Sequence, residues 1–434
     1  MGDDGLFLIF GQMLKQRLAS LYPQAEVIFN TTQRLNRAQG MCNFTDVSQF
    51  AVLGGGSNIG EMFVRFEPLQ NAVHKGHPMF VFGSGYDDAQ VKMSENELKM
   101  LQNNTWQNAS RPLFELGKRR HNPYQRQIDI LQHHNVSGGI RGPLTLRFLQ
   151  AARPGFQIPI TYDAGLVAEK YYPVTEAMKQ DMLSRVLHLT QQEVKQKPIV
   201  VLNVGETGTT FGSKRTDSLK QVLSDIAVAL SDKYWVVMYL IWPKDLAFTR
   251  SVFNEAVKAY ERRASKAIAD ASKSSSASPK PRVPILMLQD ALSLPEILTL
   301  TSLAHFTVGF KLHANIFSAA TRTPPIMLAY RMKGLDFMNS VELAEYALKT
   351  NELTVKALLG KVELLERDRR FVLRKLDRAI KVSSRLYDQA MVEFMDRLRL
   401  CHKDQFAFLS KQRKLRVTAT IQEQGGVLEI APVA

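Results

Sequence analysis

Several features that mark particular classes of protein are missing from this chain of 434 residues. It has only two cysteines, Cys42 and Cys401, and they lie far apart in the sequence. Two such cysteines form neither a disulfide framework nor a metal site, so we expect two inert thiols. No apolar stretch approaches the roughly 20 residues that span a bilayer, and no charged-then-apolar leader is visible. We expect no membrane span and no secretion signal within this sequence.

Histidine pairs occur at two places, but neither pair has a third ligand at the spacing of a metal site. The pairs are His74/His77 and His133-His134. We therefore expect no metal site and no cofactor.

Asparagine sequons for glycosylation are frequent in the first third of the chain. They act only in a secretory lumen, so a Golgi-type setting stays open beside coincidental polar loops in a cytoplasmic protein. The five sequons begin at Asn30, Asn43, Asn103, Asn108 and Asn135.

Positive charge dominates, with a net charge of +15 and a pI near 9.7. Such a balance attracts anions, which include nucleic acids, acidic membranes, acidic small molecules and glycans. Many of the cations follow Val355 in a helical pattern, where acids such as Glu363, Asp368 and Asp377 alternate with them. That alternation is typical of a solvated helix face. Because no aromatic-rich strand motif or zinc knuckle accompanies the charge, we expect no nucleic-acid binding.

Apolar runs of strand length alternate with helical patterns along the chain. Because hydrophobicity is continuous within these runs, they indicate strands buried on both faces and hence parallel sheets. The strand-like runs are 26–29, 50–53, 79–82, 136–140, 199–204, 234–241, 285–288, 306–308 and 326–329. The helical patterns are 6–21, 142–151, 175–189, 216–231, 249–272, 294–300 and 314–320. The alternation predicts a doubly wound α/β architecture.

A break between Tyr171 and Pro198 divides the pattern into two sets of strands. We expect an N-terminal domain at 1–174, a C-terminal domain at 175–398 and a tail at 399–434. The Ser/Pro-rich stretch 272–283 has nothing to bury and is expected to be a disordered insertion. In the tail, Val417–Ile421 and Val427–Ile430 are expected to pair as a hairpin.

The most informative segment runs from Ala304 to Lys333. Its apolar run leads through Gly309 to Lys311 and His313, at the head of a small-residue helix. A cation and an imidazole at a strand-to-helix junction point to the cleft at the carboxyl ends of the strands of an open α/β sheet. Helix amino ends favour anions. The segment therefore predicts a site for an anionic substrate that also needs a proton moved.

This segment resembles the carboxyl-terminal signature of the polysaccharide pyruvyl transferase family, which reads strand, Gly, Arg-Leu-His-Ala, small-residue helix, Pro, apolar strand, Tyr, Lys. Other pieces match in family order, over about residues 2–340. They are Gly2-Asp3-Asp4-Gly5, Gly54-Gly55-Gly56-Ser57, Val81-Phe82-Gly83-Ser84-Gly85, Gly139-Ile140-Arg141-Gly142-Pro143-Leu144-Thr145, Tyr162-Asp163-Ala164 and Leu294-Pro295-Glu296. The resemblance implies two Rossmann-like domains that face a cleft, like the glycosyltransferase B fold.

The resemblance also implies a transferase that moves a pyruvyl group from a phosphoenolpyruvate donor to a sugar or polysaccharide acceptor, forming a pyruvate ketal. His313 is the expected catalytic residue, and it shares the cleft with Arg141. The expected donor contacts are Lys311, Arg141, Lys333, Gly205 and Thr207. The expected acceptor contacts are Asp3, Asp4, Gly55, Gly56 and Ser57.

Two departures from the family pattern matter. Lys311 stands where the family usually has Arg. The positive charge is kept, but an ammonium cannot form the two parallel hydrogen bonds of a guanidinium. The chain also opens directly on Gly2-Asp3, where the family has a complete first strand. A lost central strand leaves an unpaired sheet edge, which is costly. Two alternatives therefore stay open: a glycosyltransferase with a nucleotide-sugar donor on the same fold, and a catalytically inactive relative.

Overall fold

The structure, a computed structural model, describes residues 2–21, 23, 26–32, 50–54, 56–59, 69–70, 73–86, 123–205, 216–271, 282–401, 414–422 and 425–432. The chain folds into two compact units. The first contains residues 168–334 and 342–378, and the second contains residues 2–167, 335–341 and 379–434. The described residues 414–422 and 425–432 belong to the second unit, and the expected domain bounds stay a prediction.

The first unit is built on a six-stranded sheet in which every strand pair is parallel. The strand order is β8-β7-β6-β9-β10-β11, so it reverses direction between β6 and β9. This is the doubly wound 3-2-1-4-5-6 order of Rossmann sheets. The strands are β6 (Ile199–Asn203), β7 (Trp235–Tyr239), β8 (Ile285–Met287), β9 (Ala304–Gly309), β10 (Pro325–Ala329) and β11 (Ala347–Lys349).

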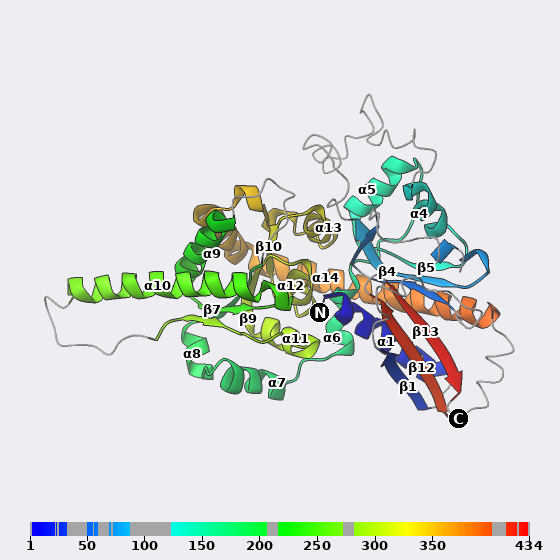
Figure 1. Cartoon of the computed structure of the whole chain (residues 1–434), viewed down its shortest axis with the longest axis horizontal. Helices are drawn as coiled ribbons and strands as arrows, with labels where there is room; N and C mark the ends of the chain where they lie inside the picture. The colour runs from blue at the N-terminus through cyan, green and yellow to red at the C-terminus, as the bar shows by residue number, and fades with distance from the viewer. Residues whose placement is uncertain are drawn as a thin grey trace. The chain divides into compact units, whose positions relative to one another are not determined.

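Helices cover this sheet, and Figure 1 shows β7 and β9 between α9 and α11. The strands β6, β7 and β10 are buried along their whole length, as continuous apolar runs predict. The helices are α6 (Ala168–Tyr171), α7 (Glu176–Asp181), the π-helical η5 (Met182–Val186), α8 (Gln191–Gln196), α9 (Thr216–Leu230), η6 (Pro243–Asp245), α10 (Leu246–Ala271), α11 (Leu294–Leu303), α12 (Leu312–Ala320), η7 (Ala344–Tyr346) and η8 (Thr350–Glu352). Two more, α13 (Met332–Ser340) and α14 (Val355–Cys401), begin in this unit and end in the other.

The second unit has a seven-stranded mixed sheet with the path β1-β12-β13-β2-β4, in which β4 also pairs with β3 and β5. The strands are β1 (Glu26–Thr32), β2 (Ala51–Leu53), β3 (Gly56–Ile59), β4 (Met79–Tyr86), β5 (Val136–Ile140), β12 (Lys414–Gln422) and β13 (Gly425–Pro432). Its helices are α1 (Gly2–Leu21), α4 (Pro123–Leu131), α5 (Pro143–Ala152) and η4 (Ala164–Val167).

Aromatic side chains tie α1, β4 and the end of α14 together in the second unit. Phe394 of α14 lies with its ring centroid 5.3 Å from that of Phe80 and 5.2 Å from that of Phe50. The ring centroid of Phe10 in α1 lies 5.4 Å from that of Phe80 and 5.5 Å from that of Phe82. Such edge-to-face contacts between buried rings add to the free energy of burial and fix how the helices pack on the sheet.

The expected α/β class is confirmed, and so is the hairpin near the end of the chain, because β12 and β13 pair antiparallel. This hairpin also covers one edge of β2. The side of β2 that does not face β4 pairs with β13. A strand from the end of the chain therefore covers that edge, which satisfies backbone groups that would otherwise attract another strand.

Several elements lie outside the strand-like runs and helical patterns expected from the sequence. The Gly-rich segment at 54–57 contains the start of β3, whose Gly56 pairs with Ser84 of β4. Glycine carries no side chain to pack, so no apolar run marks this strand in the sequence. The short β11 and the helices α4, α8 and α13 were not expected either. The insertion at 272–281 lies outside the described residues.

Candidate functional site

The carboxyl ends of β6 and β9 meet where the strand order of the first unit reverses. Ligands of open α/β sheets bind outside the strands at such a point. β6 ends at Asn203, and β9 ends at Gly309, two residues before Lys311. The cation singled out by the sequence therefore lies at the position where the topology predicts a ligand.

Asn203 fixes the backbone at this point, and it is fully buried. Its side-chain oxygen accepts a hydrogen bond from the Lys311 backbone N–H at 3.0 Å, and its amide donates to the Tyr239 carbonyl at 3.1 Å. The Asn315 amide donates to the carbonyls of Gly309 and Lys311, both at 3.0 Å. Three hydrogen bonds made by two buried amides therefore hold the turn that presents Lys311.

Lys311 is the N-cap residue of α12 and is only 6% exposed. Its ammonium lies 3.3 Å from a carboxylate oxygen of Asp245, at the end of η6. It also lies 4.9 Å from the ring centroid of Trp242 and 5.8 Å from that of Tyr330. A cation against the positive end of a helix requires a compensating anion. Within the chain, Asp245 supplies one.

Three more cations surround the same two aromatic rings. The ammonium of Lys244 lies 4.0 Å from the Trp242 ring centroid. Arg331 and Lys333 lie 5.5 Å and 5.8 Å from the Tyr330 ring centroid. We call this group, with Asn203, Gly205, Asp245, Lys311 and His313, the switch-point cluster. Four of its described members are Lys or Arg and one, Asp245, is a carboxylate, so these members together favour anions.

His313 lies in the first turn of α12, two residues after Lys311. It is half-buried, and its ring stacks on that of Phe317 with centroids 5.8 Å apart and an interplanar angle of 26°. Helix geometry explains the contact, because residues four apart lie on one face. The structure thus holds the imidazole in a defined orientation next to the cationic turn.

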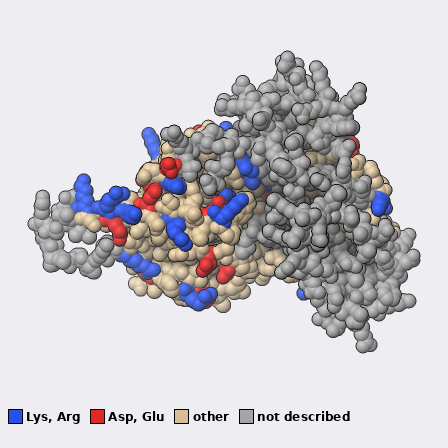
Figure 2. All heavy atoms as spheres, viewed as in Figure 1, with Lys and Arg blue, Asp and Glu red and all other residues tan. Residues whose placement is uncertain are grey.

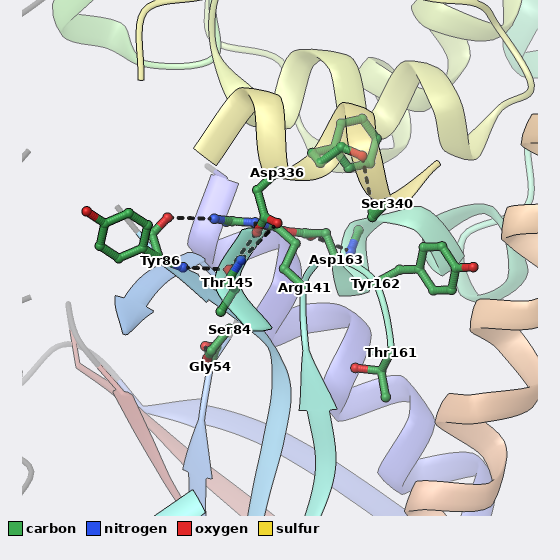
Figure 3. Close-up of polar contacts among 12 residues, drawn as sticks. Gly54, Ser84, Tyr86, Arg141, Thr145, Thr161, Tyr162, Asp163, Asp336 and Ser340 are labelled. Atoms are coloured by element: carbon green, nitrogen blue, oxygen red, sulfur yellow. Dashed lines mark hydrogen bonds and ion pairs between the residues drawn. The ribbon is translucent and has the colours of Figure 1, made fainter. Parts of the chain in front are cut away.

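In the second unit, Arg141 follows the end of β5 directly and is completely buried (Figure 3). Its guanidinium donates to the Tyr86 carbonyl at 3.1 Å and lies 3.4 Å from an Asp336 carboxylate oxygen. A third nitrogen is 4.0 Å from Asp163. The Cα of Gly85 faces the guanidinium so closely that a Cβ there would lie 2.1 Å from Nη2. Arg141 therefore has two acidic partners and a carbonyl within its own unit.

Asp336 also caps the amino end of α5. Its Oδ1 accepts from the backbone N–H groups of Leu144 at 2.9 Å and Thr145 at 3.2 Å, and its Oδ2 accepts from the Thr145 hydroxyl at 2.6 Å. The N-cap residue itself is Gly142, which has no side chain to do so. A carboxylate from α13 thus occupies the anion-favouring end of α5.

The structure describes only some of the remaining residues that were expected to contact donor or acceptor. Asp3 and Asp4 lie in the first turn of α1, and their side chains are outside the description. Gly56 and Ser57 lie in β3, and their contact with an acceptor stays a prediction. Gly55 and Thr207 lie outside the described residues. Lys311, His313, Gly205 and Lys333 lie in the first unit and Arg141 in the second, so their shared site stays a prediction.

Sequence reasoning missed four residues: Asn203, Trp242, Asp245 and Asp336. A signal existed for two of them, because a polar residue that ends a wholly apolar strand marks the edge where sites form. Asn203 ends β6 in this way. Asp245 follows β7 by six residues, within the turn that leaves the same sheet edge.

Within the described ranges, no group of three His, Cys, Asp or Glu side chains is placed to hold a metal ion. Three histidine rings lie close together, because the His133 ring centroid is 4.2 Å from that of His134 and 6.1 Å from that of His74. Partial burial lowers the pKa of His133, and the two neighbouring imidazoles lower it further. No helix in the described part of the chain is long and apolar enough to cross a membrane.

Comparison with protein families gives a match to the family model of the polysaccharide pyruvyl transferases over residues 8–331. Comparison with curated proteins gives no match.

Solved structures similar to this chain include S. aureus MnaA in complex with UDP, at a TM-score of 0.42 and 10% identity, with 88% of this chain and 79% of that one covered. E. coli ADP-heptose LPS heptosyltransferase II has a TM-score of 0.36 at 15% identity, covering 84% and 97%. A putative UDP-N-acetylglucosamine 2-epimerase from Listeria monocytogenes has a TM-score of 0.39 at 10% identity, covering 93% and 80%.

Proposed function

We propose a function on the basis of family membership: the chain belongs to the polysaccharide pyruvyl transferase family, whose model matches more than half of it. It is accordingly an enzyme of the transferase type. The proposed reaction moves a pyruvyl group from phosphoenolpyruvate to a sugar of a polysaccharide or glycan and forms a pyruvate ketal.

The observation that supports this donor is the positive balance of the switch-point cluster. Phosphoenolpyruvate carries a carboxylate and a phosphate, so it needs several cations close together. The cluster has Lys244, Lys311, Arg331 and Lys333 around two rings, with Asp245 as the single carboxylate among its named members. Lys311 is buried and Arg331 and Lys333 are half-buried, which strengthens their charge interactions relative to bulk water, whereas Lys244 is exposed.

The chemistry sets requirements that the cluster meets. One proton must be added to the methylene carbon of the donor, which becomes the methyl group of the ketal. The first sugar hydroxyl then bonds to the adjacent carbon, the carbon–oxygen bond to phosphate breaks, and the second hydroxyl closes the ring. Two hydroxyl protons are released, one of which replaces the proton used on carbon while the other leaves with phosphate. An imidazole suits both proton transfers near neutral pH.

The proposed roles follow from this scheme. His313 is the proton donor and acceptor, and Lys311 holds the donor's phosphate or carboxylate. Lys333, Gly205, Thr207 and Arg141 are further proposed donor contacts, the last conditional on its release from Asp336. Asp3, Asp4, Gly55, Gly56 and Ser57 stay the proposed acceptor contacts.

A direct test is ³¹P NMR of the protein with phosphoenolpyruvate and an acceptor sugar that has two adjacent or 4,6-placed hydroxyls. Inorganic phosphate should appear together with a ketal methyl signal in the ¹H spectrum. Thermal-shift measurements with phosphoenolpyruvate and with nucleoside-diphosphate sugars give the donor class independently. Stabilisation by a nucleotide sugar alone would favour a glycosyltransferase, and stabilisation by neither donor would favour an inactive relative.

A further inference from the structure

The exposed face of α14 carries one sign of charge over a long distance. From Arg367 to Arg378, the part of the helix that lies within the first unit, every exposed residue is a cation except Phe371, and we call this row the α14 line. The line consists of Arg367, Arg370, Phe371, Arg374 and Arg378. Its members recur at intervals of three or four residues, so they follow one face of the helix.

The acids that alternate with these cations in the sequence have other partners. Glu366 bonds with the His305 ring at 2.8 Å and accepts from the Tyr234 hydroxyl at 3.2 Å. Asp377 pairs with Arg322 at 3.4 Å. Glu366, Asp368 and Asp377 are half-buried, whereas Glu363, which precedes the line, is exposed. The alternation in the sequence therefore does not produce an alternation on the surface.

One acid does compensate one member of the line. Asp368 forms two hydrogen bonds with its neighbour Arg367, at 3.0 and 3.1 Å, which lowers the pKa of the carboxyl group. Among the described residues, Arg370, Arg374 and Arg378 form no ion pair. On the face drawn in Figure 2, by contrast, acidic and basic side chains mix over the coloured part of the surface.

Phe371 gives the line an apolar contact point. It is 48% exposed, and Lys375 and Arg374 lie 4.5 Å and 5.8 Å from its ring centroid. From Arg367 to Arg378, within the first unit, the helix rises about 16 Å, which places a cation roughly every 5 Å. A linear row of guanidinium groups with one aromatic ring matches an extended polyanion.

We propose that the α14 line binds a glycan chain that carries carboxylates, such as the enzyme's own pyruvylated product. The proposal rests on the proposed function, because each ketal adds one carboxylate to the acceptor polymer. All four cations of the line are Arg, whose planar fork binds a carboxylate through two hydrogen bonds. Retention of an already modified segment would keep the polymer near the enzyme between transfers.

Other polyanions fit the line less well. A helix that lies on a membrane needs a broad apolar face turned outward. Here Val372, Leu376 and Ala379 are buried in the protein, and Phe371 is the line's one apolar residue. Single-stranded nucleic acid stacks its bases on successive aromatic side chains, and the line has one ring.

The test uses the full chain and fluorescent polygalacturonate oligomers, with affinity measured by anisotropy at several salt concentrations. The triple variant Arg370→Gln, Arg374→Gln, Arg378→Gln should bind at least about tenfold more weakly, with a shallower salt dependence, because fewer counterions are released. Its matched control is Lys258→Gln, Arg262→Gln, Lys266→Gln on the exposed face of α10, which removes the same charge at the same spacing. The control should change the affinity less than about twofold.

Three results would overturn the proposal. Equal weakening in both triple variants would mean that only net charge matters. Stronger binding of phosphatidylserine vesicles, or of single-stranded DNA of equal charge, that is lost in the α14 variant would assign the line to a membrane or to nucleic acid. Binding is measured without phosphoenolpyruvate, so it does not depend on turnover. Phosphate release with a short neutral acceptor tests the proposed reaction separately, and the α14 variant should retain it.

Discussion

Lys311 and Arg141 occupy matching places in the two units, each between the end of a parallel strand and the start of a helix, yet their surroundings differ. Arg141 is wholly buried and has Asp336, Asp163 and the Tyr86 carbonyl as partners. Lys311 has Asp245 as its carboxylate partner and shares its two aromatic rings with further cations. Among the described residues, Arg141 has two carboxylate partners, whereas Lys311 has one and shares its two rings with three more cations. An exogenous anion is therefore better accommodated beside Lys311.

The largest expected effect concerns His313, next to Lys311. The variant His313→Ala should lower turnover by about 10²–10⁴-fold, since positioned general acids contribute on that scale. Its affinity for phosphoenolpyruvate, measured by calorimetry, should change little, because a proton donor acts mainly in the transition state. Turnover at the wild-type rate in this variant would show that His313 is not the proton donor.

The second prediction concerns Arg141 and its carboxylate partner Asp336. Asp336→Ala should lower the free energy of unfolding by about 3–5 kcal/mol, because it leaves a buried guanidinium poorly paired and uncaps α5. Urea denaturation followed by circular dichroism measures this loss. Asp129→Ala is the control, since its pair with Arg153 is exposed and in the same unit, and it should cost less than about 1 kcal/mol. Similar losses in both variants would show that the Arg141 network is not a stabilising element.

The third prediction concerns Lys311 of the switch-point cluster. Lys311→Ala should weaken phosphoenolpyruvate binding by about ten- to a hundredfold, the value of a charge-assisted hydrogen bond. Lys311→Arg should retain binding, because charge is kept and a guanidinium also pairs with Asp245 and stacks on Trp242. Calorimetric titration decides both, with Lys258→Ala on α10 as a surface control. Unchanged affinity in Lys311→Ala would place the donor elsewhere.

The sequence predicts the strands of both sheets well because their apolar runs are continuous and buried, as in β6 and β7. It predicts the position of Lys311 because one short segment contains a strand, a turn and a helix start. It could not predict the partners of the two cations. Arg141 and Asp336 are 195 residues apart in the chain, and nothing local to α13 shows which helix its carboxylate caps. Whether a cation is compensated depends on such long-range pairs.

The smallest expected effect compares one substitution at two glycines. A Cβ at Gly85 would lie 2.1 Å from Arg141 Nη2, and a Cβ at Gly205 would lie 2.6 Å from Lys311 Cε. Gly85→Ala should cost about 1–3 kcal/mol of unfolding free energy, because three partners prevent the guanidinium from moving. Gly205→Ala should cost less than about 1 kcal/mol, because its Cβ would mainly meet the far end of the flexible Lys311 side chain, with the Asp245 carboxylate 3.0 Å away.

The same pair of variants separates stability from binding. Because Gly205→Ala displaces the Lys311 ammonium, its affinity for phosphoenolpyruvate should fall more than its stability does. Parallel urea denaturation and calorimetric titration of the two variants provide the comparison. If Gly205→Ala is the more destabilising of the two, Lys311 is held as rigidly as Arg141. The switch-point cluster would then be a structural network rather than a ligand site.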